Sequence, residues 1–271
     1  MYRACFNGKE LNESLFTPGF TAYDKRIQYQ EYDVTELIAT ENTLSIEASE
    51  GWAVGNMSIL PGKNHRYSDH IKVIYSLDII FSDGTGAKIV SDESTTVTTS
   101  RIISSSIYDG ETVDMTSEIK QLGNAVLTEY ETKLVPDEGE RVLEHEVFYP
   151  SELIITPKGE RVIDFGQNLA GYVEIEISAK HGARITLSHA ETLDADGSFY
   201  TDNLRSAKAQ NTYVCKGDGK EVFKPRYSWQ GFRFLTFSVL AENSADSVRQ
   251  KKHGGPCELV CIFKCFHTLL C

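Results

Sequence analysis

Carboxylates are the most abundant reactive side chains in this chain, which holds 39 Asp and Glu among 271 residues. Two carboxylates that flank a glycosidic bond can hydrolyse it as general acid and general base, at about 6.5–9.5 Å apart when the site inverts configuration. Glu191 and Asp194 are two acids that stand close together in the sequence. With so many acids, however, some pairs meet that distance by chance. We therefore expect a structural role for both, beside a hairpin turn at Asp196-Gly197.

A second group of residues has the chemistry of a sugar site. Such sites pair an aromatic ring, which faces C–H groups, with amides or carboxylates that bind hydroxyls. The first half of the chain offers Trp52, Tyr23, Asp24 and Asn56, and Trp52 is the best single candidate. The alternative is that each aromatic is a core residue, which is the commoner role for such side chains.

A third pattern is the stretch Asp164-Phe165-Gly166-Gln167-Asn168, which is apolar in the middle and amide-rich at its end. One interpretation is a polar edge that faces a sugar or another domain. The other, which we favour, is a strand interrupted by a bulge, where Gln167 and Asn168 satisfy backbone groups.

Composition and motifs exclude several functions. The formal charge is −12 and the acids are dispersed, so no basic patch favours nucleic acid. The chain has no apolar run of about 18 residues that would span a membrane. It also lacks a glycine-rich phosphate loop, a His-Glu-x-x-His helix and a Gly-x-Ser-x-Gly elbow.

Cysteine usage and the N-terminus bear on the compartment. Only Cys5 and Cys215 precede residue 240, which indicates a reduced protein, and no signal peptide is visible after Met1. We therefore expect a cytoplasmic location. The remaining cysteines crowd into the last fifteen residues, at spacings that fit a zinc site only loosely.

The elements that would position these residues are strands. Residues 71–80 and 87–90 have strand character, with a hairpin turn signal at Asp83-Gly84 between them. Residues 172–177 alternate strictly, which places Val173, Ile175 and Ile177 on one face. Long helical periodicity is absent. Short strands separated by glycine turns predict an all-β fold of two β-sandwich domains.

Three stretches of the second half resemble the signature of bacterial α-L-rhamnosidases, glycoside hydrolase family 78: residues 164–171, residues 189–197 and residues 203–209. The motif residues that carry this resemblance are Asp164, Gly166, Gln167, Asn168, Glu191, Asn203 and Arg205.

The first half resembles the N-terminal domain of the same enzymes, through residues 17–26, Glu50-Gly51-Trp52 and residues 107–111. The chain departs from the family in having Glu50-Gly51-Trp52-Ala53 where Asp-Gly-Trp-Tyr is usual. Met1 also lies almost at the family's Asn7-Gly8-Lys9 turn, so we expect the first sandwich to lack an edge strand.

The resemblance implies the organisation of the chain. Residues 1–133 are expected to form a jelly-roll of galactose-binding type, and residues 134–240 a concanavalin-like sandwich. In those enzymes a catalytic (α/α)6 barrel, which carries two glutamates, follows these domains, and we expect this chain to lack it. Residues 241–271 resemble nothing in the family, and we expect them to be unstructured or the product of a frameshift.

The function implied is that of a non-catalytic accessory fragment of an α-L-rhamnosidase-like enzyme. The expected partners are a rhamnose-containing carbohydrate and a catalytic barrel domain, with neither nucleic acid nor membrane. One alternative is a stand-alone rhamnose-binding module. A related module of the family uses calcium, so the resemblance leaves room for that ion, although no calcium loop is visible here. Another alternative is a scaffold that docks on a separately encoded barrel.

Overall fold

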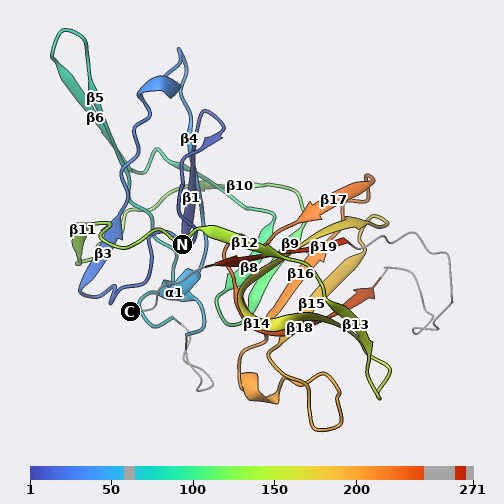
Figure 1. The fold of residues 1–271 in the computed structure, drawn as a ribbon. Coiled ribbons are helices and arrows are strands. Elements are labelled where there is room, and N and C mark those ends of the chain that lie inside the picture. Colours follow the sequence, from blue (N-terminus) through green and yellow to red (C-terminus); the bar gives the residue numbers. More distant parts are fainter. Residues whose placement is uncertain (58–64, 241–259, 267–271) are drawn as a thin grey trace.

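The computed structural model describes residues 1–57 and 65–240, together with the backbone of residues 260–266 (Figure 1). These residues are nearly all strand or loop, which confirms the all-β prediction. Helical structure within them is limited to α1 (Gly51–Val54) and the 3₁₀ turns η1 (Thr35–Leu37) and η2 (Asp202–Leu204). No helix in this part of the chain is long and apolar enough to cross a membrane.

One ten-stranded sheet organises most of the molecule. Its strands are β8 (Ile102–Ser106), β9 (Gly110–Asp114), β12 (Glu144–Phe148), β13 (Glu152–Ile155), β14 (Arg161–Ser178), β15 (Arg184–Ala190), β16 (Gln210–Val214), β17 (Lys220–Phe223), β18 (Gln230–Leu240) and β19 (Val260–Phe266).

The long strand β14 is the axis of this sheet. Along one edge, the first part of β14 pairs with β18 and its last residues pair with β17. Along the other edge, its start pairs with β13 and its later part with β19. The predicted alternation of β14 is confirmed, because Val173, Ile175 and Ile177 are all buried. They pack with Ile185 and Leu187 of β15 in the main hydrophobic core, around which the sheet curls (Figure 1).

Two strands from the first half of the chain extend the same sheet. The antiparallel pair β8–β9 joins it because β9 runs parallel to β16, with Thr112 opposite Thr212. Gly110 permits this approach: it has φ +98°, and a Cβ there would stand 1.8 Å from the Gln210 carbonyl oxygen. The sheet therefore crosses the expected domain boundary at residue 133.

The rest of the first half forms small separate sheets. They comprise β1 (Tyr2–Phe6) with β2 (Lys9–Glu10) and β4 (Leu44–Ala48), β3 (Arg26–Tyr29) with β11 (Lys133–Pro136), β5 (Ser76–Ile80) with β6 (Gly86–Val90), and β7 (Thr96–Thr98) with β10 (Gln121–Asn124). The β5–β6 hairpin projects from the body (Figure 1). Its turn at Asp83-Gly84 was predicted, and Gly84 has φ +83° there.

The tail differs from its expected unstructured state in one segment. Residues 260–266 form β19, which lies between β14 and β12 and pairs antiparallel with both. An extended backbone at this position provides hydrogen-bond partners for the backbone N–H and C=O groups of both neighbouring strands. Residues 241–259 and 267–271, with Cys257 and Cys271, lie outside the described residues.

Candidate functional site

Most of the family-motif residues of the second half lie where β14 passes β18. Asp164 on β14 accepts two hydrogen bonds from Arg233 on β18, with 2.8 Å from Nε to Oδ1 and 2.8 Å from Nη2 to Oδ2. The Gly166 amide donates a third bond to Asp164 Oδ1, at 2.7 Å. The hydrogen bonds from Arg233 hold the pKa of Asp164 below its usual value. A carboxylate engaged in this way is a structural group.

The residues after Asp164 form the bulge that the sequence predicts. The register between β14 and β18 jumps from Asp164 opposite Phe234 to Leu169 opposite Phe232. Gly166, Gln167 and Asn168 are exposed on this bulge. Gly166 has φ +84°, and a Cβ there would stand 2.9 Å from Ser151 Oγ, so glycine fits this position for two reasons.

Glu191 belongs to the same polar face, whereas Asp194 belongs to a turn. The Asn168 side-chain amide lies 3.4 Å from Glu191 Oε1. Asp194 Oδ1 accepts hydrogen bonds from the Asp196 and Ser198 amides at 2.9 and 2.7 Å. The predicted turn at Asp196-Gly197 is confirmed, and Gly197 has φ +79°.

Asn203 and Arg205 lie apart from this face, in the loop between β15 and β16. Asn203 is in η2 and Arg205 follows it with φ +57°, and both are exposed. Within the described residues, no hydrogen bond or ion pair joins either side chain to the bulge or to Glu191. The sequence motif therefore divides into a polar face, defined here as Gln167, Asn168 and Glu191, and a separate loop.

The candidate sugar-binding residues of the first half occupy different environments. Tyr23 is buried at 5% exposure and donates its hydroxyl to the Gly19 carbonyl at 2.6 Å, so its ring is a core group. Asp24 is exposed beside Lys25, at 3.6 Å, and Asn56 is half-buried. Sugar binding by these residues stays a prediction.

Trp52 packs at the junction between the two halves of the chain. It is half-buried in a cluster built around Phe16 and Tyr172, and Tyr172 comes from β14. Trp229 belongs to the same cluster, so both tryptophans of the protein lie there. The more exposed Phe20 ring stands 6.0 Å from the Trp52 ring.

A buried carboxylate that the sequence did not reveal lies at the same junction. Glu111 on β9 is 1% exposed and accepts hydrogen bonds from the Tyr227 amide at 2.8 Å and the Arg226 amide at 3.1 Å. Burial raises the pKa of Glu111 to about 7, against the opposing effect of these bonds. Glu47 on β4 accepts from Arg226 Nη1 and from the Tyr227 hydroxyl, both at 3.1 Å.

His189 on β15 is a second buried titratable group. Its Nδ1 donates to the Ala209 carbonyl at 2.7 Å, and its ring packs edge-on against Phe232 with 4.7 Å between centroids. Burial lowers the pKa of His189 to about 4, so the ring is neutral near neutral pH. No partner for Nε2 is present among the described residues.

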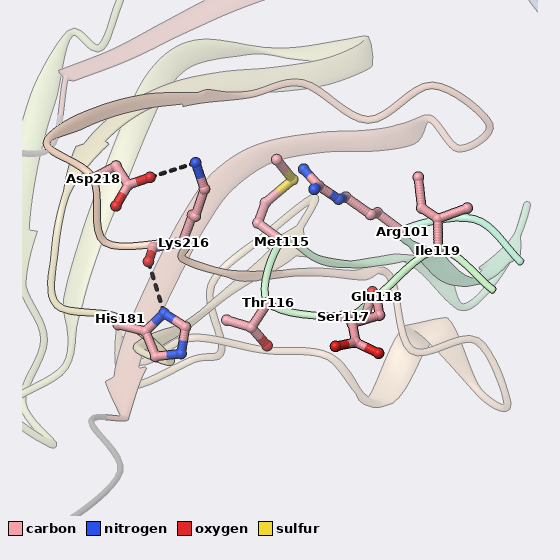
Figure 2. Close-up of a pocket in the computed structure, with 9 residues that line it drawn as sticks. All are labelled: Arg101, Met115, Thr116, Ser117, Glu118, Ile119, His181, Lys216 and Asp218. Carbon is pink, nitrogen blue, oxygen red and sulfur yellow. Dashed lines mark hydrogen bonds and ion pairs between the residues drawn. The ribbon is translucent and has the colours of Figure 1, made fainter.

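The described surface also has an open depression of about 580 Å³, shown in Figure 2. It is lined by Arg101, Met115, Thr116, Ser117, Glu118, Ile119, His181, Lys216 and Asp218. These residues come from the segment before β8, the turn after β9, the β14–β15 turn and the β16–β17 turn. The depression thus combines residues from both halves of the chain.

The described residues were also compared with the ligand sets that metal ions need. Across residues 1–57 and 65–240, no three His, Cys, Asp or Glu side chains come together in a way that could hold a metal ion. That part of the chain therefore has no cluster of three carboxylates of the kind that holds calcium in proteins.

Comparison with known protein families accounts for most of the chain. Residues 1–146 match the α-L-rhamnosidase N-terminal domain, and residues 154–252 match the bacterial α-L-rhamnosidase concanavalin-like domain. The second match continues past residue 240, where the resemblance was expected to end. Both halves of the chain thus correspond to β domains of glycoside hydrolases, and the chain belongs to the bacterial α-L-rhamnosidase family.

Individual relatives agree with this assignment. An α-L-rhamnosidase of Streptomyces avermitilis is 33% identical over 248 residues, which cover 87% of this chain and 24% of that protein. One from Formosa agariphila is 31% identical over 253 residues, 88% of this chain and 27% of that protein. The chain therefore spans about a quarter of the length of these curated relatives.

Solved structures show the same relationship. The native α-L-rhamnosidase of Aspergillus terreus superposes with a TM-score of 0.85 at 28% identity, over 99% of this chain and 31% of that one. The Streptomyces avermitilis enzyme, solved in complex with L-rhamnose, gives a TM-score of 0.80 at 28% identity, over 99% of this chain and 26% of that one.

Proposed function

We propose that this chain is a non-catalytic accessory part of an α-L-rhamnosidase-like glycoside hydrolase that acts on L-rhamnosides. The observation that carries the proposal is the pair of domain matches, which cover residues 1–146 with the N-terminal domain and residues 154–252 with the concanavalin-like domain of the family. The catalytic unit of the family is a helical barrel, whereas the described residues contain one four-residue α-helix.

The state of the motif acids supports a non-catalytic role. General acid–base hydrolysis of a glycoside needs two carboxylates that face the scissile bond from opposite sides. Asp164 is instead bound to Arg233, and Asp194 accepts amides of its own turn. Without a positioned acid–base pair, the large rate gain of a glycosidase has no source in these residues.

The polar face supports a partner for this part of the enzyme. Gln167 and Asn168 are exposed on a bulge that the Asp164–Arg233 pair fixes, and Glu191 lies beside them. A rigid, exposed set of amides and a carboxylate suits docking to a second polar surface. We propose that this surface belongs to the catalytic barrel, and that the ligand of the assembly is a rhamnose-containing carbohydrate.

The test is an activity assay on the purified chain with p-nitrophenyl α-L-rhamnopyranoside. The Streptomyces avermitilis enzyme serves as the positive control. We expect no nitrophenol release above the buffer rate. Sustained hydrolysis that co-elutes with the chain on a sizing column, and that disappears when Asp164 or Glu191 is replaced, would overturn the proposal.

A further inference from the structure

Turns held by hydrogen bonds form two walls of the depression in Figure 2. On one wall, Asp114 Oδ1 accepts the Thr116 amide at 2.8 Å, and the Met115 amide bonds the Val214 carbonyl at 3.0 Å. These bonds fix the turn after β9 against the end of β16. A preorganised wall loses little entropy when a ligand binds.

The opposite wall is fixed by Glu221 and Gly217. Glu221 accepts the amides of Lys216 and Gly217, both at 2.9 Å. His181 Nδ1 donates to the Lys216 carbonyl at 2.8 Å. Gly217 has φ +88°, and a Cβ there would stand 2.3 Å from the backbone nitrogen of His181, so the two turns are in close contact.

The charges that line the depression balance. Lys216 forms an ion pair with Asp218, as Figure 2 shows. Arg101 and Glu118 remain, and neither forms an ion pair within the described part of the chain. Arg101 is half-buried and extends toward Met115 (Figure 2). An unpaired guanidinium can donate to a ligand in the depression, and an unpaired carboxylate can accept from one.

The remaining lining residues suit a hydroxyl-rich ligand. Nδ1 of His181 donates to the Lys216 carbonyl, which leaves Nε2 to bind a ligand hydroxyl. Thr116 and Ser117 donate their hydroxyls to Asp114, which leaves their oxygen lone pairs available. Met115 and Ile119 supply apolar surface for C–H groups.

We propose that this depression binds a neutral sugar through its hydroxyls, with Arg101 as a donor and Glu118 as an acceptor. An anionic ligand fits less well, because Glu118 lies in the lining and the chain carries a formal charge of −12. The choice of a sugar rests on the proposed function. The site is distinct from the polar face and from Trp52, since neither contributes to its lining.

The experiment is an amide NMR titration of the whole chain with methyl α-L-rhamnopyranoside. The control ligand is its 2,3-O-isopropylidene derivative, in which the vicinal hydroxyls are blocked. We expect the first sugar to shift the amides of residues 115–118, 181 and 216, and the blocked sugar to leave them unchanged. Equal shifts with both ligands, or shifts confined to other residues, would overturn the proposal.

Two substitutions test the assigned roles. Arg101→Met removes the guanidinium and keeps the aliphatic stem. Glu118→Ala removes an exposed carboxylate that accepts no hydrogen bond within the described residues, so this variant should fold normally. It therefore keeps the test valid if Arg101→Met is misfolded. We expect each to weaken sugar binding at least about fivefold, the loss of one good hydrogen bond to a charged group. Lys180→Met and Glu129→Ala are matched controls outside the lining and should bind like the parent chain. Unchanged affinity in both test variants contradicts the site.

These outcomes are separable from the proposed function. A chain that hydrolyses the nitrophenyl rhamnoside overturns the accessory role and leaves the titration result standing. A chain that is inactive and shows no shifts at the depression overturns only the sugar site.

Discussion

Asp164 and Arg233 are joined by two parallel hydrogen bonds of 2.8 Å each, at the point where the ladder between β14 and β18 changes register. The pair spans the bulge that presents Gln167 and Asn168. A planar guanidinium bound bidentately to a carboxylate fixes orientation as well as distance. The motif acid thus acts through geometry: it holds the polar face in place.

Replacing Asp164 by Asn should remove the ionic part of this contact while keeping its shape. The pKa of Asp164 is held below its usual value, so its contribution to stability is present above about pH 4 and is lost as the pH falls further. We expect Asp164→Asn to lower the free energy of unfolding by roughly 1 kcal/mol at pH 7, as measured by urea unfolding. Below pH 4, the free energy of unfolding should fall less steeply with pH in the variant than in the parent chain. Lys158→Met, which removes a surface partner of Asp194, should change nothing measurable. The same fall in unfolding free energy below pH 4 in Asp164→Asn and in the parent chain would contradict this account.

Glu111 should make the chain less stable as the pH rises. Its folded pKa of about 7 lies above the ordinary 4.5 of a glutamate, so the stability from its bound proton is full below pH 4.5 and is lost by pH 7. The separation corresponds to about 3 kcal/mol. We expect the free energy of unfolding to fall more between pH 5 and pH 8 in the parent chain than in Glu111→Gln. Parallel pH profiles for the two proteins would show that Glu111 is ionised throughout.

His189 should have the opposite effect and make the chain less stable as the pH falls. Its folded pKa of about 4 lies below the ordinary 6.5, so its contribution is present above pH 6.5 and is lost as the pH falls through 4. His189→Asn keeps a donor for the Ala209 carbonyl but removes the ring that packs on Phe232. We expect a cost of about 1–3 kcal/mol at pH 7 and a smaller loss of stability between pH 7 and pH 4.5 than in the parent chain. A variant that remains as acid-sensitive as the parent would exclude His189 as the source.

Local patterns predicted several of the elements but not their pairing. The alternation of Val173, Ile175 and Ile177, the hairpin at Asp83-Gly84 and the turn at Asp196-Gly197 all depend on neighbouring residues, and all three are confirmed. The parallel pairing of β9 with β16 joins strands about 100 residues apart, which no local pattern encodes.

The site residues show the same division. The bulge after Asp164 was readable from a glycine followed by two amides. Glu111 was not, because a glutamate is usually exposed and its burial depends on amides of Arg226 and Tyr227 far along the chain. Trp52 was identified as notable, but its neighbours Tyr172 and Trp229 come from the other half.

Gly110 should be among the positions least tolerant of a side chain. Its φ is +98°, and a Cβ would stand 1.8 Å from the Gln210 carbonyl oxygen, so Ala would force β9 away from β16. We expect Gly110→Ala to cost more than about 3 kcal/mol or to prevent folding. Gly84→Ala is the matched control, since Gly84 has φ +83° but nothing within 4 Å of the added carbon, and should cost only about 1 kcal/mol. The comparison requires thermal unfolding of both, and equal costs would mean that the backbone conformation alone matters.

Trp52 offers a direct distinction between a core role and a sugar-binding role. Trp52 and Trp229 both pack in the cluster around Phe16 and Tyr172, so tryptophan fluorescence should report the junction of the two halves. Because Trp52 is half-buried, we expect Trp52→Ala to cost about 2 kcal/mol, less than a fully buried tryptophan, with red-shifted emission from Trp229. Phe20→Ala removes a neighbouring ring that is 52% exposed and should cost less than about 1 kcal/mol. A sugar platform gives the reverse result: Trp52→Ala then leaves the unfolding curve unchanged and abolishes amide shifts near Trp52 in the rhamnoside titration.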